Sequence, residues 1–236
     1  MDPLLISAAS GMNARMEALD LLANNIANTN TAGYKADREF NTLFQSHLPL
    51  VQRQWTDYSQ GNLVSSGNPL NLGLAGPGFI ALNTPTGVVY TRNGAFRISK
   101  SNQLETVEGY TLRNTRDQGK PILVDPEQSI DIDKEGVVHQ GGTELGKIEI
   151  VTIDDAQTAL KKQGTSYYAL ATTAATPKPV TVTDILQGTL EQSNVPASEQ
   201  PVHLVSIMRQ FEMLQRAMVV GTTMDKLAIQ EVAKVI

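Results

Sequence analysis

Large apolar residues recur every seven positions at both ends of the chain, and this repeat constrains the fold more than any other feature. Near the N-terminus it falls on Leu5, Met12, Leu19 and Ile26. Near the C-terminus it falls on Leu204, Phe211 and Met218, with Ile207 and Leu214 beside them. Such a repeat makes an apolar seam along a helix that another helix must cover. The sequence therefore predicts long terminal helices over about residues 3–28 and 202–235, packed together as a coiled-coil-like domain.

The residues between these helices carry a period of two instead. β-branched and aromatic residues gather in short runs at 79–82, 88–90, 95–98 and 148–151, separated by turn signals such as Asn93-Gly94 and Gly141-Gly142. A short helix fits within 155–161. We therefore predict an α+β fold with an inserted all-β domain. The predicted division is a terminal helical domain of residues 1–35 and 198–236, extended connectors of residues 36–75 and 183–197, and an all-β domain of residues 76–182.

Composition excludes several classes of protein. The chain has 236 residues, a formal net charge of -5 and scattered basic residues, whereas nucleic-acid binding needs concentrated Lys and Arg. It has no Cys, which excludes disulfides and thiolate chemistry. No stretch approaches the roughly 20 apolar residues of a membrane-spanning helix. The N-terminus lacks the pattern of a cleavable signal peptide, which suits a cytoplasmic protein and equally one exported by a route without such a signal.

Two glycine-rich stretches carry part of the spacing of a ligand-binding loop. Residues 141–147 have the spacing of a phosphate-binding loop, but Ile148 stands where Ser or Thr is needed and a strand follows where a helix is required. Residues 131–136 open like a calcium loop, but Gly142 stands where a bidentate Glu is required. We interpret both as turns between strands, with weak adventitious calcium binding left open at the second.

The sequence offers no catalytic constellation. His47, His139 and His203 are far apart, and none has the spacing of a zinc ligand. The G-x-S-x-G elbow of a serine nucleophile is absent. We therefore predict no enzyme activity, no metal, no cofactor and no small-molecule substrate.

An asparagine cluster marks the predicted end of the first helix. These amides have two interpretations: they terminate the helix, or they bond to neighbouring subunits and fix the register of packing. On the second interpretation they join the apolar seams in one predicted subunit-packing surface. That surface comprises Leu5, Met12, Leu19, Asn24, Asn25, Ile26, Asn28, Gly33, Leu204, Ile207, Phe211, Leu214 and Met218.

Several motifs resemble those of a known family. Residues 23–28, Ala-Asn-Asn-Ile-Ala-Asn, and 31–35, Thr-Ala-Gly-Tyr-Lys, resemble the N-terminal motif of flagellar rod and hook proteins. Further stretches agree at 67–72, 76–79, 90–96 and 188–195, whereas residues 100–180 match only loosely. The short connector over 37–61 is similar to that of proximal-rod members rather than distal-rod members. Pro77 departs from the family, in which an acidic residue is commoner.

The resemblance implies an axial structural protein of the bacterial flagellum. Its partners would be copies of itself, other proximal-rod and distal-rod proteins, and the flagellar type III export apparatus. Its location would be the periplasmic rod of the basal body, reached without a cleaved signal peptide. The terminal helices would form the inner tube of a helical shaft that transmits torque.

Three alternatives to this interpretation remain open. Within the same class the chain is a distal-rod or other hook-basal-body protein. From another class it is an enzyme or ligand-binding β domain with helical dimerisation ends, which a deep polar cleft with converging carboxylates would favour. A β-domain adhesin is a third interpretation, and the motifs at both ends leave it little room.

Overall fold

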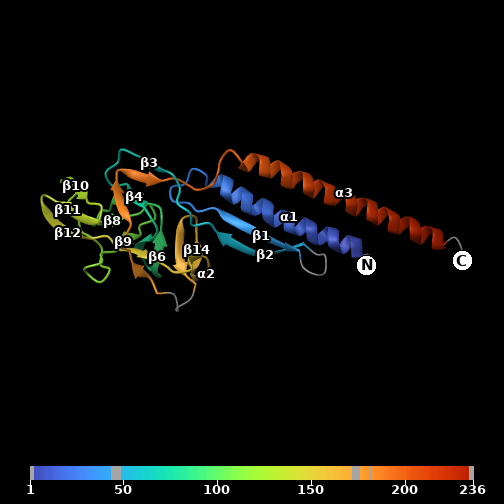
Figure 1. Ribbon diagram of the computed structural model, residues 1–236, viewed down its shortest axis with the longest axis horizontal. Coiled ribbons are helices and arrows are strands. Elements are labelled where there is room, and N and C mark those ends of the chain that lie inside the picture. The colour runs from blue at the N-terminus through green and yellow to red at the C-terminus, as the bar shows by residue number, and fades with distance from the viewer. Residues whose placement is uncertain (1–2, 44–48, 172–175, 181, 234–236) are drawn as a thin grey trace. The chain divides into compact units, whose positions relative to one another are not determined.

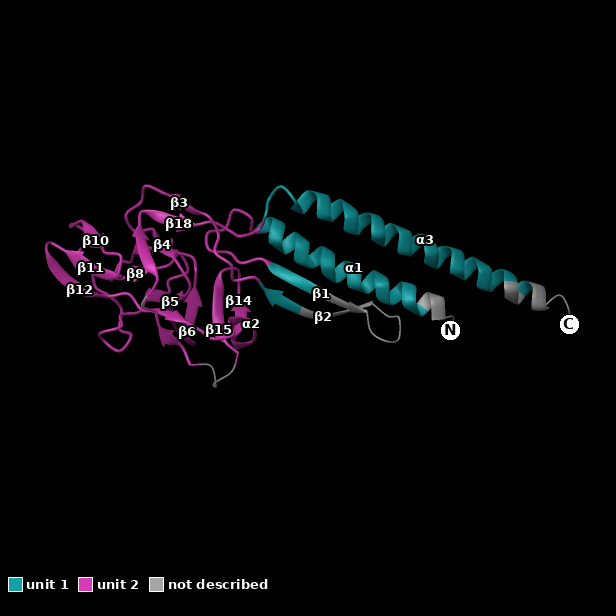
Figure 2. Cartoon of the chain, viewed as in Figure 1, with its two compact units in different colours: residues 1–27, 37–56, 196–236 teal, residues 28–36, 57–195 magenta. Residues whose placement is uncertain are grey.

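The computed structural model describes residues 3–43, 49–171, 176–180 and 182–233 (Figure 1). The chain forms two compact units (Figure 2). Unit 1 contains residues 1–27, 37–56 and 196–236, and unit 2 contains residues 28–36 and 57–195. The chain therefore passes from the first unit to the second and back twice.

Unit 1 consists of two long helices and a β-hairpin. Helix α1 covers Pro3–Ala27 and helix α3 covers Gln200–Ala233, close to the bounds expected from the apolar repeats. Strands β1 (Asp37–Leu43) and β2 (Pro49–Thr56) pair antiparallel. Both α3 and the hairpin pack against α1, so α1 lies in the middle of the unit.

The expected coiled-coil-like pairing of the helices is wrong. The buried stripe of α1 consists mainly of small residues, namely Ala8, Gly11, Ala14, Ala18, Leu21, Leu22 and Asn25. By contrast, Met12 and Leu19 of the predicted seam are only half-buried, and Ile26 is 38% exposed. Knobs-into-holes packing needs large residues at the seam. Here α1 is covered from two sides, and its buried stripe presents mainly small side chains. The α+β class stands, without a coiled coil.

Unit 2 is built from short strands and one helical turn. Every strand pair within it is antiparallel. Its elements are β3 (Leu63–Ser65), β4 (Leu72–Ala75), β5 (Phe79–Thr84), β6 (Gly87–Thr91), β7 (Arg97–Ile98), β8 (Leu104–Glu105), β9 (Thr111–Leu112), β10 (Ile130–Ile132), β11 (Val137–Gln140), β12 (Thr143–Lys147), β13 (Ile150–Thr152), α2 (Ala156–Ala159), β14 (Leu160–Gln163), β15 (Tyr167–Leu170), β16 (Lys178–Pro179), β17 (Asp184–Gln187) and β18 (Thr189–Glu191).

Strand β5 runs through the middle of the core of unit 2. It pairs with β6, β9 and β13 in the largest sheet of the described residues. Successive side chains of a strand point to opposite faces. Accordingly, Ile80 and Leu82 join one buried apolar cluster, while Phe79 and Ala81 join another. The first cluster also contains Leu72, Leu74 and Ile185, which lie outside residues 76–182.

The glycine-rich stretches form turns. Gly141 and Gly142 connect β11 to β12, and residues 133–136 connect β10 to β11, so both serve as the strand turns expected of them. Asn93-Gly94 separates β6 from β7 but does not join them as a hairpin, because β6 and β7 do not pair with each other. Gly94 instead lies against β4, where a Cβ atom would fall 1.7 Å from the Leu72 carbonyl oxygen. Close backbone approach, and not a hairpin turn, requires the glycine there.

Candidate assembly surface

One side of α3 carries the predicted packing residues of the C-terminal seam. Leu204, Ile207, Phe211, Leu214 and Met218 are all half-buried and lie three or four positions apart, on one face of the helix. Gly221 is buried on the same side. Since α3 packs against α1, this face is the one that unit 1 partly covers. A role for these residues between subunits stays a prediction.

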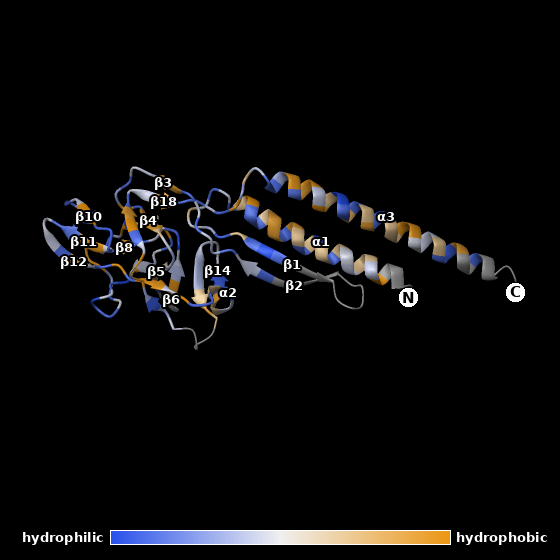
Figure 3. Cartoon of the chain, viewed as in Figure 1, coloured by the Kyte–Doolittle hydropathy of each residue, from blue (hydrophilic) through white to orange (hydrophobic). Residues whose placement is uncertain are grey.

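The opposite side of α3 carries a second apolar stripe that is open to solvent. Val202, Met213, Val220, Met224 and Leu227 are between 56% and 71% exposed. A shallow groove at the start of this stripe is lined by Pro201, Val202, Val205, Ser206, Arg209, Gln210 and Met213. Figure 3 shows hydrophobic residues recurring along the length of α3. We call residues 202, 206, 209, 213, 216, 220, 224 and 227 the outer stripe. Their steps of three or four keep them on one face.

Sequence reasoning missed the outer stripe as a separate surface. Met213, Val220 and Leu227 are themselves seven residues apart, so the signal was present in the printed sequence. The repeat from Leu204 to Met218 gives the stronger apolar pattern, so the sequence was interpreted as having a single seam. A helix with apolar residues on two faces needs covering on both. Within one chain, α1 covers only one of them.

The predicted packing residues of α1 are distributed over several faces. Met12 and Leu19 are half-buried and Ile26 is partly exposed. Leu5 lies in α1, but its side chain is outside the described residues. Asn24 is exposed, and its amide donates to the Asp20 carbonyl within the same helix at 2.9 Å. The predicted surface is therefore not one continuous stripe on α1.

Asn25 has a bonding role inside unit 1. Its amide nitrogen donates to the carbonyl oxygen of Asp37 at 2.8 Å, and its amide oxygen accepts from the Asp37 backbone N–H at 3.0 Å. These two hydrogen bonds have the same arrangement as those between paired residues of two strands. Asn25 therefore fixes the start of β1 against the end of α1. Its contribution to a subunit contact stays a prediction.

Asn28 begins the turn that follows α1. It accepts from the Thr31 hydroxyl at 3.1 Å through its side chain and from the Thr31 N–H at 3.1 Å through its carbonyl. Gly33 ends this turn with a φ of +67°, and a Cβ atom there would fall 2.3 Å from the carbonyl carbon of Arg92. Glycine is thus required by both conformation and space. These contacts explain why the segment after α1 needs this sequence.

A buried cluster of three charged residues lies next to Gly33 in unit 2. The Glu191 carboxylate accepts from Lys35 Nζ at 2.5 Å and from Arg92 Nη1 at 3.2 Å. It also accepts from the Gly61 backbone N–H at 2.8 Å. The Lys35 and Glu191 side chains are fully buried, and that of Arg92 is 4% exposed. We call Lys35, Arg92 and Glu191 the charged junction.

Further bonds extend the charged junction. Lys35 Nζ donates to the Ser59 carbonyl at 2.6 Å, and Arg92 Nη2 donates to the Gly76 carbonyl at 2.8 Å. The Arg92 guanidinium also lies over the Phe79 ring, 5.6 Å from its centroid. Burial lowers the pKa of both Lys35 and Arg92, and the Glu191 carboxylate opposes this shift. Buried charges are tolerated only when paired and hydrogen-bonded in this way.

The charged junction joins motifs that are far apart in the sequence. Lys35 belongs to the motif after α1, Arg92 to the motif at the end of β6, and Glu191 to β18. Asn194 adds a second link, because its amide oxygen accepts from the Ala36 N–H and its amide nitrogen donates to the Asp57 carbonyl, both at 2.7 Å. The motifs that identify the chain therefore build an intramolecular junction. This role was not predicted from the sequence.

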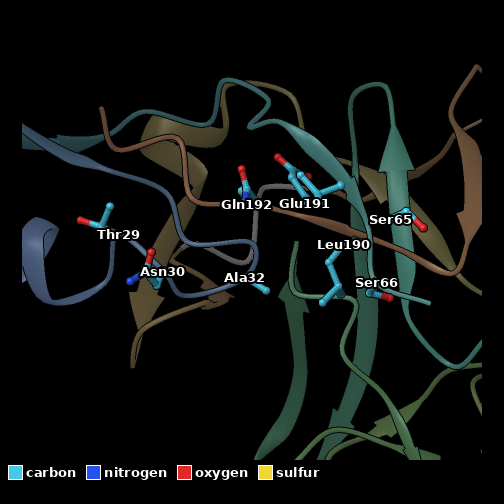
Figure 4. A pocket seen from close by; sticks show the side chains of 9 residues that line it. Thr29, Asn30, Ala32, Ser65, Ser66, Leu190, Glu191 and Gln192 are labelled. Atoms are coloured by element: carbon cyan, nitrogen blue, oxygen red, sulfur yellow. The ribbon is translucent and has the colours of Figure 1, made fainter. Parts of the chain in front are cut away.

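A small cavity of about 230 Å³ opens beside the charged junction (Figure 4). Thr29, Asn30 and Ala32 line it from the segment after α1, and Ser65, Ser66 and Leu190 line it from the region of β3 and β18. Glu191 also lines the cavity, but its carboxylate is already bonded to the junction cations. The cavity does not bring together converging carboxylates, the feature that would favour the enzyme or ligand-binding alternative.

The described residues show no arrangement for metal chemistry. Among them, no three His, Cys, Asp or Glu side chains come close enough to hold a metal ion. No helix in the described part of the chain is both long and apolar enough to cross a membrane. What the structure does offer is an exposed apolar face on a helix of unit 1, which is a feature suited to association with another protein.

Comparisons with known proteins agree with this view. Residues 5–35 match the family described as "Flagella basal body rod protein", residues 73–140 the D1 domain of the flagellar hook protein FlgE/F/G, and residues 186–231 the C-terminal part of the FlgEFG rod proteins. The flagellar basal-body rod protein FlgF of Caulobacter vibrioides is 31% identical over 245 residues, which cover 98% of each chain.

Two more relatives extend the comparison. The protein named FlgF in Rhizobium meliloti is 28% identical, with 88% of each chain covered. The protein named FlgG in Agrobacterium fabrum is 30% identical, with 95% of this chain and 96% of that protein covered. The chain therefore belongs to the family of flagellar basal-body rod proteins, and it is a structural subunit of the rod of the flagellar basal body and not an enzyme.

Proposed function

We propose that this subunit assembles through its terminal helices with copies of itself and with other basal-body rod proteins, forming a helical shaft that transmits torque. The observation that carries the proposal is the outer stripe of α3. Five large apolar side chains on this face are more than half exposed. A soluble chain gains by covering them, and burial of each large side chain contributes about 1.5–3 kcal/mol before ordering costs.

The geometry of the helices favours an open array over a closed dimer. The outer stripe of α3 differs in residues and in size from the exposed face of α1, so a contact between the two joins unlike surfaces. Repetition of a contact between unlike surfaces gives a ring or an open helical filament, not a two-fold pair. A rod is such a filament. The half-buried seam of Leu204, Ile207, Phe211, Leu214 and Met218 faces the inside of unit 1 and would stabilise the paired helices within each subunit.

We also propose a periplasmic position, reached through the flagellar type III export apparatus with α1 retained. Family membership supports this route. The packing of unit 1 supports retention of α1, because Ala8, Gly11 and Ala14 lie buried against the rest of the unit. Removal of α1 would expose the inner seam of α3. Nucleic acids and small-molecule substrates have no part in this proposal.

A charge in the outer stripe tests the proposal. The variant Met213→Asp places a carboxylate in the middle of the stripe, on a residue that is 61% exposed, so the subunit should fold normally. We expect a strain that carries this variant in place of the unaltered chain to lack the part of the rod that assembles after this subunit, and to be non-motile. Electron microscopy of purified basal bodies shows whether that part of the rod is present. The matched control is Gln215→Asp, an exposed position off the stripe, which should assemble. Complete rods built with Met213→Asp would refute assembly through this face.

A further inference from the structure

The exposed face of α1 carries acidic residues among small ones. Asn13, Met16, Glu17, Asp20, Ala23, Asn24 and Ala27 are all exposed. Steps of three or four place Asn13, Glu17, Asp20, Asn24 and Ala27 on one face, which we call the acidic face. Its two charged members are Glu17 and Asp20. Its apolar member at the C-terminal end, Ala27, and the exposed Ala23 beside this face are small and leave room for large side chains from another helix.

The outer stripe of α3 is complementary to the acidic face in charge and in size. Its two charged members are both basic, Arg209 and Arg216, and both are exposed. Its apolar members, such as Met213 and Val220, are large. Within the described residues, none of Glu17, Asp20, Arg209 and Arg216 takes part in an ion pair. Two unpaired acids on one face and two unpaired bases on the other therefore remain available for contacts outside the chain.

We propose that the outer stripe of α3 receives the acidic face of α1 from a second copy of this chain, with Glu17 and Asp20 of one copy facing Arg209 and Arg216 of the other. This inference rests on the proposed function and specifies which surfaces meet. Every copy carries one of each surface, so each copy binds one neighbour through α3 and another through α1. The large side chains of the stripe fill the space that Ala23 and Ala27 leave.

The charges would set the register of the contact. Complementary charges steer association and penalise wrong pairings, because like charges brought together cost several kcal/mol. A slide by one turn along the neighbouring helix would bring both acids beside one Arg and leave the other Arg unpaired, because the acids are three residues apart and the bases seven. The apolar side chains supply adhesion without such selectivity. Charge pairing thus distinguishes one arrangement of two apolar helix faces from its shifted alternatives.

Cross-linking measures the contact directly, since the chain contains no Cys. Two singly substituted copies are expressed in one strain, one with Asp20→Cys and the other with Arg209→Cys or Arg216→Cys. Only links between copies can then form. We expect purified basal bodies treated with a short thiol cross-linker to yield a dimer of this chain. The control pairs Asp20→Cys with Gln215→Cys, which lies on another face of α3 and should stay monomeric. No dimer with either Arg position would overturn the proposal.

Charge reversal provides a second and independent measurement. Glu17→Arg with Asp20→Arg, or Arg209→Glu with Arg216→Glu, should each lower the yield of complete rods about tenfold or more, because like charges then face each other. All four reversals in one chain should restore it. Loss without restoration would show that a different protein meets these charges. Normal assembly of either reversed pair, beside failure of Met213→Asp, would refute this inference alone, whereas normal assembly of Met213→Asp would refute the proposed function.

Discussion

Glu191 holds together three parts of unit 2 that are distant in the sequence. Its carboxylate accepts from Lys35, Arg92 and the Gly61 N–H, and its backbone carbonyl accepts from the Gly33 N–H at 2.8 Å. Replacing both partners of a buried ion pair by apolar residues often costs little stability. Removing only one partner leaves an uncompensated buried charge. The cost of changing Glu191 therefore falls on Lys35 and Arg92, which would lose their counter-ion in a buried site.

The substitution Glu191→Gln should strongly destabilise unit 2. Gln keeps the size and one acceptor oxygen but removes the negative charge, and the expected loss is about 3 kcal/mol in the free energy of unfolding. Urea unfolding followed by circular dichroism measures it. Adding Lys35→Met to Glu191→Gln should cost less than the sum of the single changes, because the orphaned ammonium is gone. Additive losses would mean that Lys35 and Glu191 do not depend on each other.

Gly33 offers a second prediction with a matched control. Gly33 and Gly67 both adopt a positive φ, of +67° and +70°, but a Cβ atom at Gly33 meets the Arg92 backbone while one at Gly67 meets nothing within 4 Å. Gly67→Ala should cost only the strain of the left-handed backbone, about 1 kcal/mol. Gly33→Ala should cost clearly more, because the backbone of another segment must move. If the two variants lose the same stability in thermal unfolding, the close approach of the Arg92 backbone does not explain the need for glycine at position 33.

At the scale of the element, α1 shows why the coiled-coil expectation failed. The apolar repeat located both helices correctly, because large apolar residues at helical spacing need a partner. It did not identify the buried face of α1, because Ala and Gly give a weak apolar signal although they decide how closely two elements can approach. The sequence pattern weights a residue by its hydrophobicity, whereas packing against two neighbours at once selects for small size.

Ala18 and Ala23 test this account of α1. Ala18 is 3% exposed in the stripe of small residues, and Ala23 is exposed. Ala18→Met should destabilise unit 1 by about 1–3 kcal/mol through overpacking, whereas Ala23→Met should leave the stability of the subunit nearly unchanged. Thermal unfolding followed by the helical circular dichroism signal compares the two. A neutral effect of Ala18→Met would favour a looser, coiled-coil-like contact that accepts a large residue.

At the scale of the whole molecule, the helices and the β region could be predicted, and the junction between segments could not. Short strands with turn signals predict a β domain, since their period of two is local in the sequence. The partners of Glu191 are distant in the sequence, so no local pattern reveals them. The same holds for Leu72, Leu74 and Ile185, which the core takes from the predicted connectors. These positions were marked in the sequence only by motifs that resemble those of flagellar rod and hook proteins.

Unit 2 should fold without the helices and the hairpin. The Asp57 N–H donates to the Ala36 carbonyl at 2.8 Å, so residues 37–56 can be replaced by two glycines in a chain of residues 28–195. We expect one cooperative thermal transition, lowered by Glu191→Gln as in the full chain. A chain of residues 76–182, which lacks Leu72, Leu74 and Ile185 of the core, should melt without a cooperative transition. Cooperative melting of the shorter chain alone would show that the junction is dispensable.

The bond between Gly33 and Glu191 also has a mechanical consequence. The two segments that lead into and out of unit 2 are joined there by Gly33 N–H to Glu191 carbonyl at 2.8 Å and by Asn194 N–H to Tyr34 carbonyl at 3.4 Å. A pull on both ends of the chain is therefore transmitted directly from one segment to the other across these bonds. The residues between Tyr34 and Glu191 along the chain therefore bear less of this tension while the bonds hold. In the proposed torque-transmitting shaft, such a subunit would bear load along its terminal segments with less strain on the β sheets of unit 2.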